Sequence, residues 1–295
     1  MNYWWIMGTF MTTVDPLPQI IYDGLIRDAL HEDLGRAGDI TTDAIVPGDA
    51  MVTATIVARR SGRVAGTDVA ARVFEILDPA METKLLIIPG GDAEPDSPLV
   101  RLNGPARPIL TGERTALNLL GHLSGIATLT RDYVKAVAGT GARVVCTRKT
   151  TPGLRALEKH AVRCGGGANH RFGLDDAVLI KDNHLALAGG VCQAIMKVRE
   201  AVGHMVTVEL EVDTLEQLEE GLEAGIDAVL LDNMDPPTLR AAVAMVNGRC
   251  VTEASGGIDL DSAAAVAATG VDLLSVGALT HSAPWLDVSL EVEAD

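Results

Sequence analysis

The sequence predicts an α/β protein in two parts: an N-terminal α+β domain with sandwich-like layering, and an open, incomplete parallel α/β barrel of the TIM-like kind. The first observation is composition, because 47% of the 295 residues are hydrophobic but only 3% are aromatic, as in layered α/β cores of Val, Leu, Ile and Ala. The second is the regular alternation of secondary-structure elements. After Gly141, short apolar strands alternate with helical segments, and the last four strands begin about 22 residues apart, the length of one compact βα unit. The third is that six clear strands are found, not eight, which favours an open barrel.

The N-terminal half has no regular period and is typical of a mixed α+β unit. Apolar residues recur at helical spacing from Ile21 to Leu34, and Gly35 ends that pattern. In chain order, the sequence predicts a helix over 18–35, a strand over 52–59, a helix over 67–78, a strand over 84–89, a turn-rich loop over 89–98 and a long helical stretch over 111–139. Glycine and serine in the last stretch permit either close packing or a break.

The C-terminal half alternates strands with helices. The predicted strands lie at 143–146, 177–180, 206–210, 228–231, 249–253 and 272–276. Helices are predicted between the later strands, at 214–225, 236–246 and 261–270. We therefore expect a disordered extension over 1–16, an α+β domain over 17–115 whose first and last helices can pack on the barrel, and a catalytic barrel over 116–295.

Charge and composition exclude several classes of protein. A formal net charge of −16 argues against non-specific nucleic-acid binding, which needs a basic face. No apolar run reaches the roughly 18 residues that cross a bilayer, and residues 1–13 lack the basic start of a signal peptide. Four widely spaced cysteines form no CxxC pair and fit free thiols in a reducing cytosol: Cys146, Cys164, Cys192 and Cys250. We therefore expect a cytoplasmic protein without nucleic-acid or membrane partners.

One segment of this acidic chain is basic. Residues 143–181 hold eight of the 24 Lys and Arg residues and only three acids, a local balance of 8 − 3 = +5. A small, multiply charged anionic ligand gives a reason for such a concentration of cations. Arg155, Lys159 and Arg163 follow at four-residue spacing on one predicted helix. They form either a solvated face or a contribution to the electric field at the site.

Polar residues follow each predicted barrel strand at its carboxyl end, where the active sites of parallel barrels lie. The glycine-rich loop 164–173 lacks the P-loop and dinucleotide patterns, but its terminal arginine can clamp a carboxylate bidentately. The groups that follow the first two strands or end this loop are Thr147, Arg148, Lys149, Lys181, His170 and Arg171. The acids at the next strand ends are Glu209, Glu211, Asp232 and Glu253.

Two glycine turns follow the last strands and can present backbone N–H groups to a phosphate at a helix N-terminus. They are Ser255-Gly256-Gly257, with Asp259 as a cap for the next helix, and Val276-Gly277-Ala278. The acids at neighbouring strand ends suit Mg²⁺, which prefers oxygen ligands. These features together predict a phosphorylated sugar with a metal-bound leaving group, beside a second, anionic substrate.

Six motifs extend this interpretation: TRKTTPGLRALEKHAVRCGGGANHRFGL (147–174), LIKDNH (179–184), ELEVDTLEQL (209–218), LLDN (230–233), EASGGI (253–258) and SVGALTHS (275–282). With them, the chain from about residue 32 to its C-terminus resembles the quinolinate phosphoribosyltransferase family, also called nicotinate-nucleotide pyrophosphorylase (carboxylating). The resemblance implies an N-terminal α/β domain packed on an open barrel. It also implies transfer of phosphoribose from phosphoribosyl pyrophosphate to the pyridine nitrogen of quinolinate, giving nicotinate mononucleotide, pyrophosphate and CO₂ in NAD biosynthesis.

The resemblance implies roles for residues that match the family's motifs. Quinolinate would be bound by Arg114, Thr147, Arg148, Lys149, His170, Arg171 and Lys181. The phosphate would be bound by Ser255, Gly256, Gly257, Val276, Gly277, Ala278 and His281. The catalytic residues would be Lys149, Lys181, Glu211 and Asp232, the two acids holding Mg²⁺ or ribose hydroxyls; no organic cofactor is expected. Arg114 would reach the neighbouring subunit's site, in a homodimer or a dimer-based hexamer.

Two positions depart from the family's pattern. Cys146 stands where an Asp is expected and His160 where a Tyr is expected, although neither change removes a charged ligand. Two rival functions stay open. One is an enzyme acting on nicotinate or another pyridine monoacid, which needs fewer cations than this chain offers. The other is a non-catalytic relative, such as the molybdenum-transport-associated homologues; the intact residues 181–184 with Glu211 and Asp232 favour the enzyme.

Overall fold

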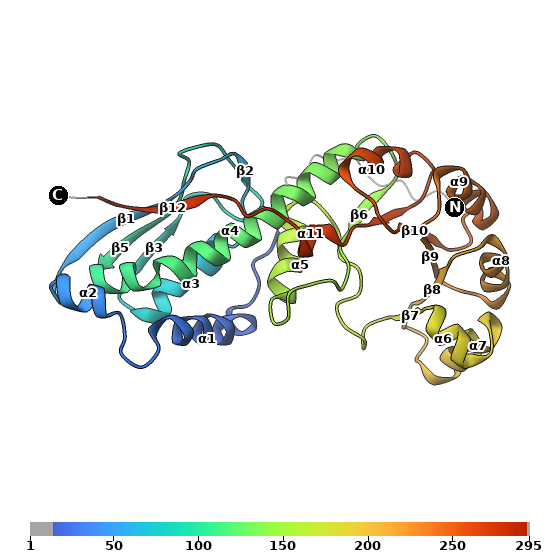
Figure 1. Ribbon diagram of the computed structural model, residues 1–295, viewed down its shortest axis with the longest axis horizontal. Helices are drawn as coiled ribbons and strands as arrows, with labels where there is room; N and C mark the ends of the chain where they lie inside the picture. Colours follow the sequence, from blue (N-terminus) through green and yellow to red (C-terminus); the bar gives the residue numbers. More distant parts are fainter. Residues whose placement is uncertain (1–13, 294–295) are drawn as a thin grey trace.

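The computed structural model describes residues 14–293, which divide into two parts joined by one long helix (Figure 1). One part contains a four-stranded sheet with helices on it, and the other a six-stranded sheet in the order β6-β11-β10-β9-β8-β7. The joining helix is α4 (Ala106–Ala136). The predicted fold class is therefore confirmed, as is the number of barrel strands. In the part of the chain that the structure describes, no helix combines the length and the apolarity needed to cross a membrane.

The N-terminal sheet is antiparallel, in the order β12-β1-β5-β3. Its strands are β1 (Met51–Ala58), β3 (Glu82–Leu85), β5 (Pro98–Pro105) and β12 (Val288–Glu293). Beside them lie a short strand pair, β2 (Gly62–Arg63) and β4 (Asp92–Ala93), the 3₁₀ helix η1 (Gln19–Ile21), and the helices α1 (Asp23–Leu34), α2 (Ile40–Ile45) and α3 (Thr67–Leu77). Phe74 of α3 is fully buried in this core.

The last strand departs from the predicted organisation. β12 pairs with β1, placing Ala54 opposite Val292, so that C-terminal residues complete the N-terminal sheet. The boundary expected between residues 115 and 116 falls inside α4, which is one continuous helix. In this part, the elements β2, β4, β5, β12 and α2 were not predicted. The sequence of β12, VSLEVE, does alternate apolar and polar residues as a strand would, but its partner β1 lies near the other end of the chain, so the local pattern did not indicate which sheet it joins.

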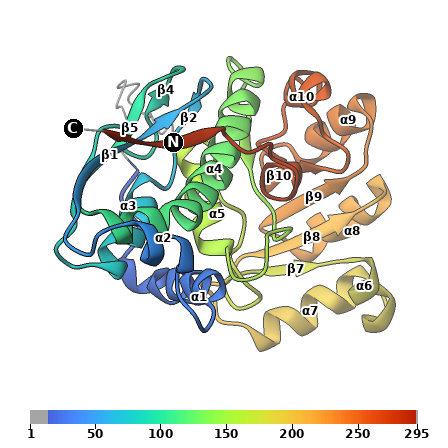
Figure 2. The same ribbon diagram turned by 60° about the vertical axis from the view of Figure 1, so that its left-hand side comes forward.

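Close packing explains why α4 continues through its small residues. A Cβ atom at Gly125 would lie 2.2 Å from the carbonyl oxygen of Pro284, so only glycine lets this chain segment approach. Of the two alternatives for these small residues, the structure shows packing without a break. Both α3 and α5 (Arg155–Cys164) pack against α4, which thereby contributes to the cores of both parts (Figure 2).

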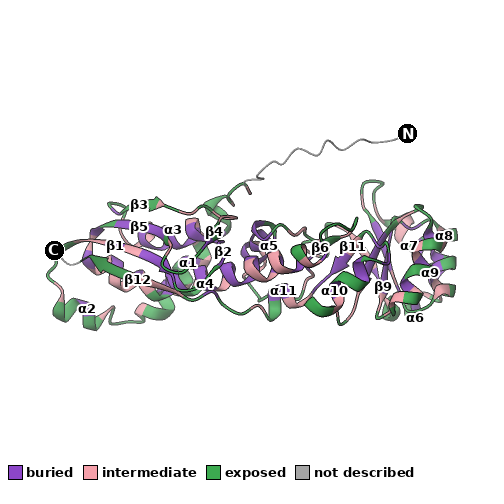
Figure 3. Ribbon diagram, turned by 90° about the horizontal axis from the view of Figure 1, so that it is seen from above, coloured by how far each residue is buried: buried purple, intermediate pink, exposed green. Residues whose placement is uncertain are grey.

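The barrel strands are all parallel. They are β6 (Arg143–Val145), β7 (Val178–Ile180), β8 (Val208–Val212), β9 (Ala228–Asp232), β10 (Val251–Ser255) and β11 (Leu273–Ser275). The helices are α5 (Arg155–Cys164), α6 (Asp182–Ala188), α7 (Val191–Ala201), α8 (Leu215–Ala224), α9 (Pro236–Val246), α10 (Leu260–Ala267) and α11 (Ala278–His281). Buried residues concentrate on the strands and on the helix faces against them (Figure 3).

The barrel is open between β6 and β7, which share no ladder within residues 14–293. The segment 146–177, which contains α5, connects these two strands, and a single bridge between Val145 and Ala168 ties it to β6. Local signals set the helix ends: Thr214 caps α8 together with Gln217, and Gly225 ends it in the left-handed region. Of the expected disordered extension over 1–16, residues 1–13 lie outside the described residues. From its described end, the Asp15 carbonyl accepts a hydrogen bond from His160 Nε2 at 3.0 Å.

Candidate active site

The carboxyl ends of the barrel strands surround a cavity of about 730 Å³. Every residue predicted to bind substrate, phosphate or metal lines this cavity except Arg114; of the two other acids named at strand ends, Glu253 lines it and Glu209 does not. Parallel strands bring these residues together because their carboxyl ends share one edge of the sheet. Residues that were not predicted for the site also line it: Leu179, Leu230, Asn233, Ile258 and Ser275.

Two arginines form the cationic side of the cavity. Arg171 Nη1 donates to the carbonyl of Ala177 at 2.9 Å, and Arg148 has a buried Nε without a hydrogen-bond partner in the described part of the chain. Burial, and then the positive charge of Arg148, lower the pKa of Arg171. Within residues 14–293, neither Arg148 nor Arg171 forms an ion pair with a carboxylate. Two adjacent cations without carboxylate partners are suited to bind an anion.

The acidic side of the cavity is formed by Glu211 at the end of β8 and Asp232 at the end of β9. Glu211 pairs with Lys181 Nζ, and Asp232 Oδ2 accepts from Asn233 Nδ2 at 2.6 Å. The two acids stand on neighbouring strands and offer hard oxygen ligands. This donor set fits Mg²⁺, with positions left for substrate oxygens and water.

Two glycine turns form the third side. Gly256 has φ +96°, and a Cβ there would lie 2.1 Å from Asn233 Oδ1, so this turn requires glycine. Asp259 accepts from the Ser262 backbone N–H at 2.8 Å, which confirms the predicted cap of α10. The second turn leads through Gly277 into α11, whose Thr280 Oγ1 donates to the Lys149 carbonyl at 2.7 Å. This bond joins the glycine-turn side of the cavity to its cationic side.

Two family models match the chain and together extend over most of it. The model for the N-terminal domain of quinolinate phosphoribosyl transferase matches residues 39–124, and the model for the C-terminal domain matches residues 126–291. The chain belongs to the quinolinate phosphoribosyltransferase family. The predicted resemblance is thereby confirmed, and the two matches meet within α4.

Individual members of the family agree with this assignment. A Mycobacterium leprae protein named nicotinate-nucleotide pyrophosphorylase (carboxylating) is 47% identical over 272 residues, 90% of this chain and 95% of its own. A Bacillus subtilis (strain 168) protein with the same name, marked probable, is 45% identical over 268 residues, 91% of this chain and 92% of its own. The structure of the Francisella tularensis nicotinate-nucleotide pyrophosphorylase is similar at a TM-score of 0.90 with 38% identity, covering 96% of this chain and all of that one.

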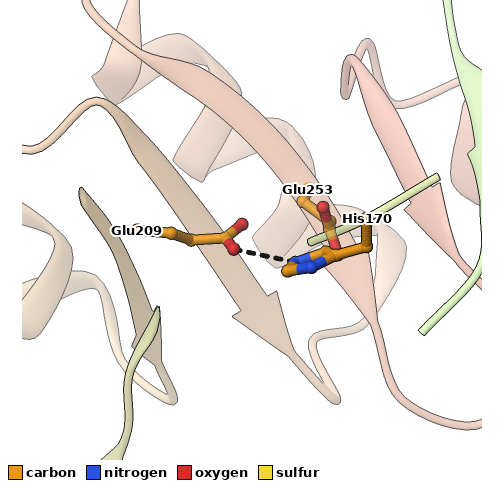
Figure 4. Close-up of side chains that lie close together, drawn as sticks. All are labelled: His170, Glu209 and Glu253. Atoms are coloured by element: carbon orange, nitrogen blue, oxygen red, sulfur yellow. Dashed lines mark hydrogen bonds and ion pairs between the residues drawn. The ribbon is translucent and has the colours of Figure 1, made fainter. Parts of the chain in front are cut away.

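A buried acid pair lies beside His170 (Figure 4). His170 Nε2 is 2.9 Å from Glu209 Oε2 and 3.7 Å from Glu253 Oε1, and its Nδ1 accepts the Arg171 backbone N–H at 2.7 Å. These contacts assign the neutral ring with its proton on Nε2. Burial lowers the pKa of His170 but the two carboxylates raise it further, so the net direction is upward. A second proton would have to displace the Arg171 N–H from Nδ1.

Glu209 and Glu253 were both named as acids at strand ends, but neither was assigned a role. Burial, and then the negative charge of Glu209, raise the pKa of Glu253 to about 7. Its Oε1 is buried without a hydrogen-bond partner among the described residues. The sequence did contain a signal for Glu209: with Glu211 it shows the two-residue spacing that places both side chains on one face of β8.

Arg114 lies on α4 with its side chain 67% exposed, away from the cavity of its own chain. Its nearest acid is Glu113, at 3.9 Å. The residue that the family motif assigned to the quinolinate site therefore lies on the surface of a single chain. Its role across a subunit boundary stays a prediction.

The three cations on α5 separate into different environments. Arg163 is exposed, Arg155 lies over the Phe172 ring at 6.0 Å, and Lys159 is only 3% exposed. Two alternatives were given for these three cations: a solvated helix face, or a contribution to the electric field at the site. Neither describes Lys159, because this side chain is buried. Its ammonium group contacts Cys146, one of the two positions that depart from the family pattern.

Proposed function

We propose that this chain transfers phosphoribose from phosphoribosyl pyrophosphate to quinolinate with loss of CO₂, giving nicotinate mononucleotide and pyrophosphate in NAD biosynthesis. The names of its relatives support this activity. The observation that carries the proposal is the pair Arg148 and Arg171: two adjacent guanidinium groups, without ion pairs in the described residues, in a cavity that also holds two strand-end acids and two glycine turns.

Each side of the cavity has a proposed occupant. The dicarboxylate of quinolinate lies against Arg148 and Arg171, with Thr147 and His170 beside them. The 5′-phosphate lies against the two glycine turns, where backbone N–H groups precede α10 and α11. The ribose and pyrophosphate lie between these ends, beside Lys149, Lys181, Glu211 and Asp232.

Charge development determines how the residues act. The pyridine nitrogen attacks the anomeric carbon as the bond to pyrophosphate breaks, so negative charge grows on the leaving oxygens. Lys149 and Lys181 stabilise that charge, an effect typically worth about 3–4 kcal/mol for a well-placed donor. Lys181 is paired with Glu211, and it can therefore exchange this carboxylate for a pyrophosphate oxygen without leaving the cavity.

We propose Glu211 and Asp232 as the residues that hold Mg²⁺ or ribose hydroxyls. When bound, Mg²⁺ neutralises part of the pyrophosphate charge. No organic cofactor is required for the second half of the reaction. Once the ring nitrogen carries ribose, the positive charge of the pyridinium stabilises the electron pair that stays on the adjacent carbon when its carboxylate departs as CO₂, and that pair then takes up a proton.

The assembly is also part of the proposal. Arg114 completes the quinolinate site of a neighbouring chain in a homodimer or a dimer-based hexamer; in its own chain its side chain is exposed and does not line the cavity. A dissociated chain would then lack one carboxylate ligand. The absence of a membrane-crossing helix within residues 14–293 is compatible with the proposed cytoplasmic location.

Turnover with two substrates tests the function. We expect nicotinate mononucleotide and CO₂ from quinolinate, phosphoribosyl pyrophosphate and Mg²⁺, and no nucleotide when nicotinate replaces quinolinate. Formation of nucleotide from nicotinate alone, without CO₂, would establish the monoacid rival. If neither acid reacts and calorimetry detects no binding of quinolinate, the non-catalytic rival replaces the enzyme.

A further inference from the structure

Helix α5 extends two cationic side chains to the segments that carry Arg148 and Arg171. Lys159 Nζ donates to Cys146 Sγ at 3.1 Å and to the carbonyl of His170 at 3.0 Å. One helical turn earlier, Arg155 Nε donates to Thr150 Oγ1 at 2.9 Å and Arg155 Nη1 donates to the carbonyl of Phe172 at 3.2 Å. Each side chain therefore bridges the same two segments.

The bridged positions enclose the two arginines of the cavity. Cys146 and Thr150 lie two residues before and after Arg148, and the bridged carbonyls belong to the residues on either side of Arg171. Only one backbone bridge, between Val145 and Ala168, ties these segments together directly as a sheet. The side chains of α5 thus fix the separation of the two arginines from both ends.

The arginines need such a support because they repel each other. The charge of Arg148 disfavours the charged form of Arg171, and Arg148 Nε has no partner among the described residues to offset this. In the absence of an anion, the two backbones must therefore be held by other bonds. Lys159 is 3% exposed, and hydrogen bonds from charged donors are stronger than those between neutral groups.

We propose that Lys159 and Arg155 are positioning residues, which hold Arg148 and Arg171 at the spacing that a dicarboxylate requires. The inference rests on the proposed function, since it concerns the same substrate. Neither residue lines the cavity, so both act through the arginines and not on the substrate. The third cation of the helix, Arg163, makes no such bridge within residues 14–293 and provides a matched control.

The test compares Lys159→Met, Arg155→Met and Arg163→Met in steady-state assays of the full-length enzyme. We expect Lys159→Met and Arg155→Met to raise the KM for quinolinate about tenfold or more, with the KM for phosphoribosyl pyrophosphate unchanged within about twofold. Arg163→Met should leave both KM values within about twofold. Arg155 is only half-buried, so its variant remains informative if Lys159→Met does not fold. Unchanged quinolinate KM in a folded Arg155→Met enzyme overturns the proposal.

A fourth variant separates position from charge. Cys146→Asp keeps an acceptor beside Lys159 but adds a negative charge, so a positioning role predicts a quinolinate KM within about twofold of wild type. A tenfold increase, at unchanged thermal stability, would show that net charge and not geometry is the contribution of Lys159. Wild-type enzyme distinguishes the two levels of failure: if it does not convert quinolinate, the proposed function fails; if it does and the variants match it, only the positioning role fails.

Discussion

Replacing Arg171 by alanine removes half of the proposed carboxylate clamp. Arg171 Nη1 is held by the Ala177 carbonyl at 2.9 Å, which orients the guanidinium and leaves Nε and Nη2 for a bidentate contact with a carboxylate. Hydrogen bonds to charged groups contribute about 1.5 kcal/mol each at the low end, so two of them amount to about 3 kcal/mol. We therefore expect the quinolinate Kd to rise about 150-fold.

Isothermal titration measures this change for each substrate separately. Phosphoribosyl pyrophosphate, titrated with Mg²⁺ into Arg171→Ala, should keep its Kd within about twofold, because its proposed contacts are the glycine turns and the acids. Arg163→Ala, on the exposed face of α5, serves as the control and should change neither affinity. An equal loss of affinity for both ligands would contradict the assignment of Arg171 to quinolinate.

Three further predictions address the assembly, the buried acid and the phosphate turn. Mixing inactive Arg114→Ala with inactive Arg171→Ala chains should restore roughly a quarter of wild-type activity, since each mixed dimer contains one intact shared site; no recovery after subunit exchange would place Arg114 outside the site. Burial raises the pKa of Glu253 to about 7, so the folded chain binds more protons than the unfolded one, and this carboxyl destabilises the fold increasingly as pH rises from 4.5 to about 7. Glu253→Gln should therefore raise the Tm more at pH 8 than at pH 5, measured by calorimetry, and the reverse order would contradict a buried acid with a raised pKa. Gly256→Ala places a methyl group against Asn233 at φ +96° and should raise the KM for phosphoribosyl pyrophosphate about tenfold, with quinolinate affinity retained; unaltered kinetics would exclude this turn from the phosphate site.

The barrel was predictable because its information is local and repeated. A parallel βα unit places a buried apolar strand and its helix within one short stretch of sequence, and the same pattern recurs down the C-terminal half. The strand ends were predictable for the same reason: once Arg148, Lys181, Glu211 and Asp232 follow parallel strands, topology alone brings them to one cavity. The N-terminal sheet was less predictable from local sequence, because its strand β12 joins β1 from the opposite end of the chain.

Arg114 shows a different limit of the sequence. A motif placed it in a quinolinate site, but a single chain carries it on an exposed turn of α4. Cys146 and His160 show a third limit. The family pattern marked both as departures, yet their contacts, with Lys159 and with the Asp15 carbonyl, depend on segments that meet only in the folded chain.

The three cations of α5 show why equal spacing does not mean equal environment. An α-helix turns 100° per residue, so each step of four residues rotates a side chain by about 40° around the axis. Lys159 stays close to the face of Arg155, whereas Arg163 is displaced by about 80°. The segments on either side of Arg148 and Arg171 cover the first two positions and leave the third exposed. Which cations of such a stripe become buried is therefore decided by what packs against the helix. For this reason, exchanging Arg155 or Lys159 should alter quinolinate binding, and exchanging Arg163 should not.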